Sequence, residues 1–420
     1  MTTPARQESS ITGHTHPASS WQVGASLSAT LTTADESFAA LHGEWDELLD
    51  ATGNASVFQS WEWAYTWWET FREGKGLRII ALRDGGQRLV GLWPLYVHRV
   101  QLMAGLRLAE VRLLGTGQEV SPDYMGPLAT PEVEPHVAPA LLNWLSSSTD
   151  EWDTARLTDV RSDAWWLPAL AQGLRESGVH ASEEPRAQCL YAELPSTFDE
   201  YLKRLDKSVR GDVRRRTRLL EQNYSPKFFR WGGEPAESGI DEIAELHRRR
   251  RAQTGNDSGA FGTPGYISFH RLLAPRLQAR NWLDLYGLRV GDNVVSILYG
   301  MTYRGVLGVY QTGFDPSWAR HGVGAILRSY VLQDAIRRGL READFLKGEY
   351  DYKGRWTNAE RRTVTVTINN ANAMGNLEYV QRNLGQQFKQ AARHYLPAPL
   401  LRLAKKARAS LKHRPKAGTT

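Results

Sequence analysis

Residues able to do chemistry concentrate in one short stretch near the end of the chain. Residues 346–356 read LKGEYDYKGRW and hold two lysines, two carboxylates, two tyrosines, an arginine and a tryptophan. Ordinary surface loops favour Ser, Asn, Asp, Gly and Pro instead. A loop that gathers acid, base and aromatic groups offers proton acceptors beside fixed positive charge, which is what general acid–base catalysis uses. We therefore take this stretch as a candidate catalytic site.

A second candidate is the turn that follows Tyr310, with the sequence QTGFDPSWARHGVGA. It leaves a predicted strand and opens a predicted helix through Gly322 and Gly324. Glycines let backbone N–H groups approach a ligand closely, and a helix N-terminus presents unpaired donors to an anion. Arg320 and His321 lie on the same turn. The pattern suits a phosphate or pyrophosphate, and a plain loop with glycine for turn geometry is the alternative.

An internal repeat in the sequence predicts the helices and strands that position these residues. Residues 77–95 align without gaps with residues 283–301, and each segment predicts a β-hairpin with glycine in its turn. In the alignment Leu77, Leu82, Arg83, Gly85 and Leu92 recur as Leu283, Leu288, Arg289, Gly291 and Leu298. The flanks repeat as well, in the order strand, helix, helix, hairpin: 26–33, 36–49 and 60–72 in the first copy, 227–231, 238–251 and 264–280 in the second. We infer a duplicated domain.

The second copy continues with further elements that frame both candidate sites. After its hairpin we predict a strand (VLGVYQTGFDP) and then a helix whose apolar stripe includes Ile326, Leu327, Tyr330 and Val331. Gly339 follows Arg337 and Arg338, as the C-terminal ends of helices prefer. ADFLKG and TVTVTI (363–368) complete the copy as strands. The stretch 346–356 therefore begins at the end of a strand.

The order of elements and the glycine turn together resemble the GNAT acyltransferase fold. In that family the turn Arg/Gln-x-x-Gly-x-Gly/Ala holds the pyrophosphate of coenzyme A, so the resemblance assigns cofactor binding to Arg320, His321, Gly322, Val323, Gly324 and Ala325. This chain departs from the signature, because Ala319 fills the Arg/Gln position and the arginine comes one place later. Backbone donors would then carry more of the binding.

Larger motifs narrow the resemblance. FxxWEWAYTWW near Phe58, GLWPLY, RLLGTG, YxxGFDP with HGVGAxL, and ADFLKGEYDYKGRW resemble the CelD-type acetyltransferase-like proteins, which are tandem GNAT proteins related to the Fem aminoacyltransferases. The resemblance covers about residues 30 to 390. It implies an α/β (α+β) fold with two tandem GNAT-like domains, each a mixed, largely antiparallel sheet flanked by helices. We expect a disordered tail over 1–25, a degenerate acceptor-side domain over 26–200, a basic connecting helix over 201–224, a catalytic domain over 225–395 and a basic tail over 396–420.

The resemblance gives the candidate catalytic residues their roles. Acyl transfer needs a base for the attacking amine, a positive charge for the oxyanion and a proton for the leaving thiolate. Tyr352 and Lys353 resemble the aromatic–lysine pair of Fem enzymes, and Lys353 supplies the charge. Glu349 or Asp351 serves as base, and Tyr310 donates to the sulfur. Tyr350 or Trp356 walls the acyl pocket.

Structural roles are the alternatives at each of these positions. Glu349 and Lys353 stand at i and i+4 and are also consistent with a surface ion pair. Tyr352 is also consistent with an anchor for the loop, and His321 with an exposed turn residue. The first copy lacks both the Gly-x-Gly turn and the Lys-Gly-Glu run. We infer that it lost the donor site and shapes the acceptor pocket, with Asp123 and Tyr124 as candidates, although both also suit a plain turn.

Composition limits the setting of the protein. The chain of 420 residues has a formal net charge of +6 and one cysteine, Cys189, which excludes an intrachain disulfide and any cysteine-rich metal site. The N-terminus has no apolar signal core, and no run approaches the length of a membrane span. A reducing, cytoplasmic setting fits best.

Two segments are strongly basic, 203–218 and 402–416. The first suits a phosphorylated acceptor, tRNA or a plain connecting helix, and the second a weak interfacial helix.

The sequence therefore predicts an acyltransferase that moves an acyl group, most simply acetyl, from acyl-CoA to an amine or hydroxyl of a polysaccharide or cell-envelope precursor. No metal and no DNA are expected, and no Walker motif, HExxH motif or serine-nucleophile elbow points to another enzyme class. Two alternatives stay open: a Fem-like aminoacyltransferase that uses charged tRNA, and a binding protein that kept the fold without turnover.

Overall fold

The computed structural model of the chain describes residues 20–24, 26–101, 105–117, 120–232, 235–254, 259–263, 265–348 and 352–395. The strands of the first half are β1 (Ser20–Gly24), β2 (Leu27–Thr32), β3 (Lys75–Arg83), β4 (Leu89–Gln101), β5 (Arg107–Leu113), β6 (Leu128–Ala129), β7 (Thr154–Arg161) and β8 (His180–Glu193). Its helices are α1 (Asp35–Ala40), α2 (His42–Ala51), α3 (Trp61–Phe71), α4 (Glu134–Ser147) and α5 (Leu167–Ser177), with the 3₁₀ turn η1 (Val57–Gln59).

The second half repeats this order. Its strands are β9 (Lys227–Arg230), β10 (Leu283–Val290), β11 (Asn293–Tyr303), β12 (Val306–Phe314), β13 (Glu342–Lys347) and β14 (Ala359–Asn369). Its helices are α6 (Phe198–Arg204), α7 (Lys207–Tyr224), α8 (Ala236–Thr254), α9 (Tyr266–Ala279), α10 (Val323–Arg337) and α11 (Ala373–Tyr395), and its 3₁₀ turns are η3 (Gly259–Gly262), η4 (Pro316–His321) and η5 (Lys353–Arg355). The predicted mixed α/β fold with a duplicated element order is confirmed.

The hairpin repeat is the clearest sign of duplication. β3 and β4 pair antiparallel, as do β10 and β11, and each pair has a register shift next to its turn. In each half the next two strands of the sheet pair in parallel, β5 with β7 and β12 with β13. The parallel pairs are joined through α4 in the first half and α10 in the second. The two halves therefore have the same local topology.

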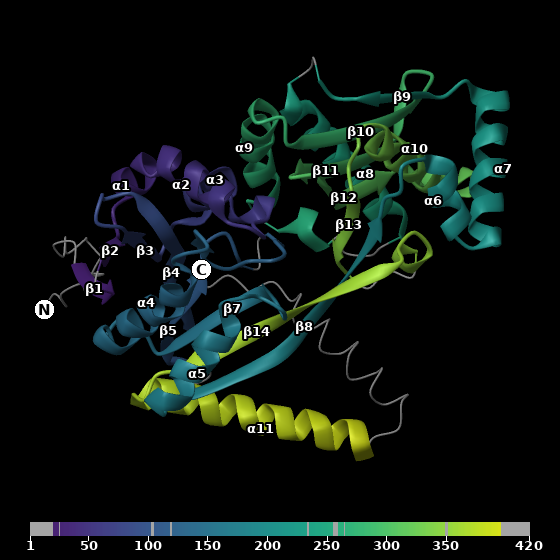
Figure 1. Cartoon of the computed structure of the whole chain (residues 1–420). Coiled ribbons are helices and arrows are strands. Elements are labelled where there is room, and N and C mark those ends of the chain that lie inside the picture. The colour runs from purple at the N-terminus through teal and green to yellow at the C-terminus, as the bar shows by residue number, and fades with distance from the viewer. Residues whose placement is uncertain are drawn as a thin grey trace, which may run out of the picture.

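All strands join one continuous sheet, and the halves exchange strands within it. The order is β1-β2-β3-β4-β5-β7-β14-β8-β13-β12-β11-β10-β9, with β6 beside β4. β14, from the second half, pairs with β7 of the first, and β8, from the first half, pairs with β13 of the second. β8 and β14 form the long ribbon that crosses the molecule in Figure 1. The expected domain boundaries stay a prediction, since the sheet runs through both halves.

The two halves also share a hydrophobic core. The tryptophan-rich motif forms α3, which begins where the Ser60 hydroxyl accepts a hydrogen bond from Trp63 N. The Trp63 ring meets Phe269 of α9 edge-on at 5.0 Å between centroids. Arg276 on α9 forms an ion pair with Glu69 on α3 at 2.7 Å. Burial of these large aromatic rings fixes α3 of the first half against α9 of the second.

Two expectations about the termini of the domains need correction. Residues 20–24, assigned from sequence to the disordered tail, form β1, because Trp21 and Val23 pack on the core while the strand pairs with β2. The basic segment expected as one helix over 201–224 is two helices, α6 and α7, separated at Leu205 and Asp206. Leu205 is in the extended conformation and is buried beside Tyr201, so the chain turns there.

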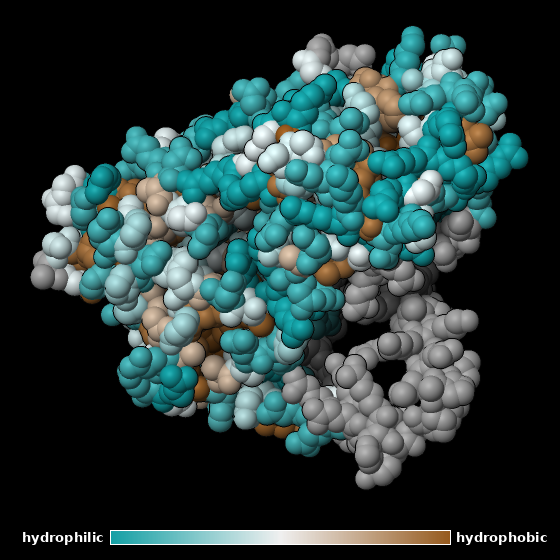
Figure 2. Space-filling model, turned by 45° about the vertical axis from the view of Figure 1, so that its right-hand side comes forward, coloured by the Kyte–Doolittle hydropathy of each residue, from teal (hydrophilic) through white to brown (hydrophobic). Residues whose placement is uncertain are grey.

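The surface is mainly hydrophilic in the view of Figure 2, where hydrophobic residues gather only in small patches. In the part of the chain that the structure describes, no helix combines the length and the apolar composition that crossing a bilayer requires. The expected basic tail over 396–420 lies outside the described residues.

Candidate active site

A cavity of about 760 Å³ opens where two strands of the second half separate. β12 and β13 pair only from Val306 to Gly308, against Glu342 to Asp344. Beyond that point β12 continues to Phe314 and β13 to Lys347, and the residues on both separated ends line the cavity. The separation leaves backbone groups of both strands facing the cavity without a strand partner across it, so an extended ligand with amide groups can pair there.

Tyr310 faces this cavity because of a β-bulge. In the pairing of β11 with β12, Tyr299 lies opposite Gln311 and Gly300 opposite Val309, so Tyr310 is the extra residue between them. A bulge of this kind re-aims one side chain. Ser121 N of the first half donates to the Tyr310 hydroxyl at 3.4 Å. Burial raises the pKa of Tyr310 above its usual value, so the hydroxyl is a proton donor at neutral pH.

Lys353 is buried and supports a second bulge at the end of β13. Leu346 has a φ of 57°, which a branched residue rarely adopts, and the pairing with β8 shifts register there. Lys353 Nζ donates to the carbonyl oxygens of Phe345 at 2.7 Å, Leu346 at 3.2 Å and Lys347 at 2.8 Å. An ammonium has three donors, and these contacts match them. Burial lowers the pKa of Lys353, and the negative charge of Asp123 opposes that shift.

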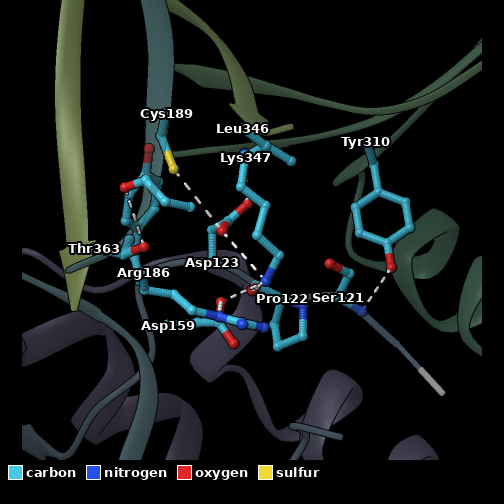
Figure 3. A network of polar contacts seen from close by, with 12 residues as sticks. Ser121, Pro122, Asp123, Asp159, Arg186, Cys189, Tyr310, Leu346, Lys347 and Thr363 are labelled. Carbon is cyan, nitrogen blue, oxygen red and sulfur yellow. Dashed lines mark hydrogen bonds and ion pairs between the residues drawn. The ribbon is translucent and has the colours of Figure 1, made fainter. Parts of the chain in front are cut away.

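The bulge turns Lys347 toward two carboxylates of the first half, as Figure 3 shows. Lys347 Nζ lies 2.6 Å from Asp159 and 3.6 Å from Asp123. Lys347 N also donates to Asp123 at 3.0 Å, and the Cys189 thiol lies 3.9 Å from the same carboxylate. Asp123 is fully buried yet lines the cavity. Burial raises the pKa of the Asp123 carboxyl, and the positive charge of Lys347 opposes the rise.

The glycine turn lies along the same cavity. Gly322 has a φ of 71° and precedes the first residue of α10, and a Cβ there would lie 2.8 Å from the Arg216 side chain. Gly322, Val323, Gly324 and Ala325 all line the cavity, so the α10 N-terminus faces it. Arg320 and His321 are not among the described lining residues: Arg320 Nε donates to His321 Nε2 at 3.1 Å, and the His321 ring packs on Tyr224 and Trp318.

The remaining predicted residues divide into three groups. Tyr352 lines the cavity beside Lys353. Trp356 is buried in the core with Tyr201, whose hydroxyl donates to the Trp356 carbonyl at 2.6 Å, and is not among the described lining residues. Glu349, Tyr350 and Asp351 lie outside the described residues.

Asp123 and Tyr124, the two residues predicted to shape the acceptor pocket, line different cavities. Asp123 lines the large cavity, whereas Tyr124 lines a smaller one of about 190 Å³ and donates to Asp344 at 2.6 Å. Asp344 is buried, and burial raises its pKa to about 6. Sequence reasoning also missed three cations along the large cavity, Arg186, Arg250 and Arg328, and gave no role of its own to Lys347, which lies in the predicted stretch. The spacing of Arg328, four residues after Gly324 and three before Val331, was the available signal that it shares a helix face with them.

One cluster of described residues has ligand atoms close enough for a metal ion. His42, Asp46 and Glu62 bring one atom each within 4.8 Å of one another. Arg280 forms ion pairs with both Asp46 and Glu62, so the chain itself supplies a cation to these carboxylates. The cluster lies on α2 and α3, and none of its members lines the large cavity.

Comparison with known proteins agrees with this geometry. Residues 207–354 match the model of a family described as an acetyltransferase (GNAT) domain. Among solved structures, FemX matches with a TM-score of 0.54 and 13% identity, over 77% of this chain and 95% of that chain. A conserved protein of unknown function from Bacteroides thetaiotaomicron matches with 0.53 and 10%, over 81% and 99%.

L-PGS from Bacillus licheniformis matches with a TM-score of 0.50 and 9% identity, over 82% of this chain and 96% of that chain. At these identities the likeness is one of fold. The comparison with curated proteins gives no match. The resemblance to GNAT-type proteins related to the Fem enzymes is confirmed: residues 207–354 match the acetyltransferase (GNAT) domain model, and the fold matches that of FemX.

Proposed function

We propose that this chain, with its GNAT domain over residues 207–354, transfers an acyl group from acyl-CoA to an amine or hydroxyl of a saccharide or cell-envelope precursor in the cytoplasm. The observation that carries the proposal is the cavity between the separated strands β12 and β13. Its walls combine the α10 N-terminus, Lys353 and Tyr310 from the second half with Asp123 from the first. One cavity therefore has a surface for a donor and a surface for an acceptor.

Each wall has a role in the transfer. The α10 N-terminus binds phosphate, and the separated strands take the extended arm of the donor between them. Asp123 accepts the proton of the attacking group, because burial raises the pKa of its carboxyl and so makes it a stronger base. Tyr310 donates a proton to the leaving sulfur. Lys353, whose donors hold the end of β13, acts on the oxyanion through its fixed charge and through the carbonyls it orients.

The test is titration calorimetry of the purified chain with acetyl-CoA, desulfo-CoA and ADP. We expect saturable binding of acetyl-CoA and of desulfo-CoA, and weaker binding of ADP, which lacks the extended arm. Release of free thiol in the presence of amino sugars or hydroxyl acceptors then measures transfer. Absence of acetyl-CoA binding would contradict the proposal.

A Fem-like transfer from charged tRNA is the second candidate. The observation that favours it is the basic helix α7, whose Arg216 donates to the Arg320 carbonyl at 3.0 Å and so lies beside the glycine turn. The same helix also carries Arg210, Arg214, Arg215 and Arg218. A basic surface next to a donor site suits a nucleic-acid backbone. Labelled aminoacyl-tRNA, offered with and without excess acetyl-CoA, separates the two donors.

A further inference from the structure

Three side chains of the first half bring together atoms of the kinds that bind divalent transition metals. His42 and Asp46 lie one helical turn apart on α2, so both point to the same side of the helix, and Glu62 lies on the first turn of α3. His42 Nε2 is 3.6 Å from Asp46 Oδ2 and 3.8 Å from Glu62 Oε1. An imidazole nitrogen and carboxylate oxygens are ligands that Zn²⁺ takes in proteins.

The spacing of these atoms is close to that of a tetrahedral zinc site. Zinc bonds of about 2.0–2.2 Å place neighbouring ligand atoms about 3.4 Å apart. The two distances from His42 are only slightly longer, and the ligand atoms of all three residues lie within 4.8 Å of one another. Small rotations of the side chains therefore bring the three atoms around one ion, with the fourth position left for water.

Two buried carboxylate oxygens lack partners in this cluster. The Glu62 side chain is 4% exposed, and its Oε2 has no hydrogen-bond partner among the described residues. Asp46 Oδ1 is buried and lacks a described partner as well. Asp50, one turn beyond Asp46, adds a third carboxylate whose charge acts on Arg280. Leaving buried carboxylate oxygens unpaired is costly, and a further cation offsets that cost.

Arg280 of α9 is suited to be the outer partner of such an ion. It forms an ion pair with Asp46 Oδ2, and its Nε lies 3.5 Å from Glu62 Oε1. Carboxylates that bind a metal are normally also hydrogen-bonded by a second residue. The guanidinium is held over the Trp282 ring, at 4.5 Å from the ring centroid. It contacts one oxygen of each carboxylate and so does not satisfy the other two.

His42 is both oriented and accessible. Its ring stacks on that of Trp61, with centroids 4.0 Å apart, and this packing directs Nε2 toward the two carboxylates. The His42 side chain is 48% exposed, whereas that of Glu62 is buried. An ion from solvent therefore reaches the cluster past the imidazole, and the buried carboxylate forms the inner wall.

We propose that His42, Asp46 and Glu62 bind one zinc ion that connects α2 to α3. The proposal does not depend on the proposed function, because none of the three residues lines the large cavity. The ion has a structural consequence for that cavity all the same. Trp63 follows Glu62 on α3, and its ring packs on Tyr310 with centroids 5.9 Å apart. Zinc therefore stabilises the helix that supports one wall of the cavity.

The experiment is calorimetric titration of the untagged full chain, treated with EDTA and then freed of the chelator. We expect one Zn²⁺ per chain, and much weaker binding of Ca²⁺ and Mg²⁺, which prefer oxygen ligands. His42→Ala and Glu62→Gln should each weaken zinc binding by at least about tenfold, since loss of an outer partner alone costs that much. The control is His14→Ala/His16→Ala, which removes the closest pair of histidines in the sequence and should bind zinc as the wild type does.

Thermal melts separate a lost site from a damaged fold. In EDTA, His42→Ala should melt at the wild-type temperature, because the side chain is half exposed. Zinc should raise the melting temperature of the wild type and not that of His42→Ala. If Glu62→Gln fails to fold, His42→Ala decides alone.

Three results would overturn the proposal. The first is the absence of zinc binding to the wild type. The second is equal zinc affinity in the wild type and in His42→Ala, which would assign the binding to other histidines. The third is binding of Ca²⁺ or Mg²⁺ as tight as that of Zn²⁺, which would mean that the oxygens hold the ion without the imidazole.

Discussion

The ammonium nitrogen of Lys353 lies 2.7 Å from the carbonyl oxygen of Phe345, eight residues earlier in the chain. Two further carbonyls of the same strand end accept from it. They belong to the bulge at Leu346, whose backbone no longer pairs regularly with β8. Lys353 therefore stabilises the irregular strand end that turns Lys347 toward Asp123 and Asp159.

We predict that Lys353→Met lowers both stability and activity. The substitution leaves two buried carbonyls and one half-buried carbonyl without their donor, which costs about 2–3 kcal/mol of unfolding free energy. Urea denaturation measures this loss. The rate of acyl transfer should also fall, because the end of β13 loses the contacts that hold it in place. The folded fraction is measured separately, so that activity can be expressed per folded molecule. A variant with wild-type stability and activity would remove Lys353 from both roles.

Asp123→Asn should reduce the turnover number by about 10²- to 10⁴-fold, as loss of a general base does. The amide oxygen can still accept from Lys347 N, and Asp159 still pairs with Lys347 Nζ, so the fold should be retained. Steady-state kinetics with saturating acetyl-CoA check the prediction. Asp163→Asn, which removes an exposed carboxylate paired with Arg161, is the control. Equal turnover in both variants would contradict the role of Asp123.

Gly324→Val should weaken acetyl-CoA binding by about tenfold without unfolding the chain. A Cβ at this position meets only Phe314, at an ordinary 3.7 Å, so the added side chain occupies the cavity and not the core. Calorimetry measures the affinity. Gly43→Val on α2, where a Cβ also finds open space, controls for the general effect of valine in a helix. Unchanged affinity would mean that no ligand approaches the α10 N-terminus.

His270 should make stability depend on pH in a defined window. Burial lowers the pKa of His270 from 6.5 to about 3, so the folded state keeps it neutral while the unfolded state takes up a proton below pH 6.5. Its contribution to stability is therefore present above pH 6.5 and is lost as pH falls toward 3, at about 1.4 kcal/mol per pH unit. Urea denaturation between pH 7 and 4 gives the unfolding free energy of the wild type and of His270→Gln as a function of pH. The wild type should lose stability more steeply than the variant as pH falls. Parallel curves for the two proteins would contradict the inference that the folded state keeps His270 neutral.

Tyr310→Phe should lower the turnover number by about ten- to a hundredfold with little change in KM, since the hydroxyl acts only when sulfur departs. The ring itself should keep its place among Phe58, Trp63 and His270. A donor with a better leaving group, such as an aryl thioester, should restore part of the rate. Failure of that donor to do so would assign Tyr310 a packing role.

The sequence was sufficient for most of the helices and strands of the two repeats, although it missed β1 and the break between α6 and α7. The hairpins at Leu77 and Leu283 carry their own periodicity and turn residues, so their pairing is local and was predicted. The strand at 363–368 was also predicted, but its partners were not. Its partners β7 and β8 lie about 200 residues earlier, and alternation of side chains does not encode which edge a strand joins.

The cations of the cavity were missed for a related reason. Arginine is exposed in most proteins, so the residue type argued against burial of Arg328, although its spacing from Gly324 and Val331 places it on their helix face. Its burial depends on Tyr352 and Trp356, which reach it only after β13 and η5 are in place. Asp123 was noticed but not distinguished from a turn residue, because Lys347 comes to it from the other half of the chain.

The exchange of β8 and β14 has a consequence for the synthesis of this protein. A ribosome delivers the first half long before residues 359–369 emerge, so the nascent first half must wait with the facing edges of β7 and β8 unpaired. Open edges of that kind invite pairing with other chains. The intermediate therefore stays exposed from the completion of β8 at Glu193 until β14 emerges from Ala359 on, and a transcript truncated before codon 359 would yield an aggregating fragment instead of a separate domain.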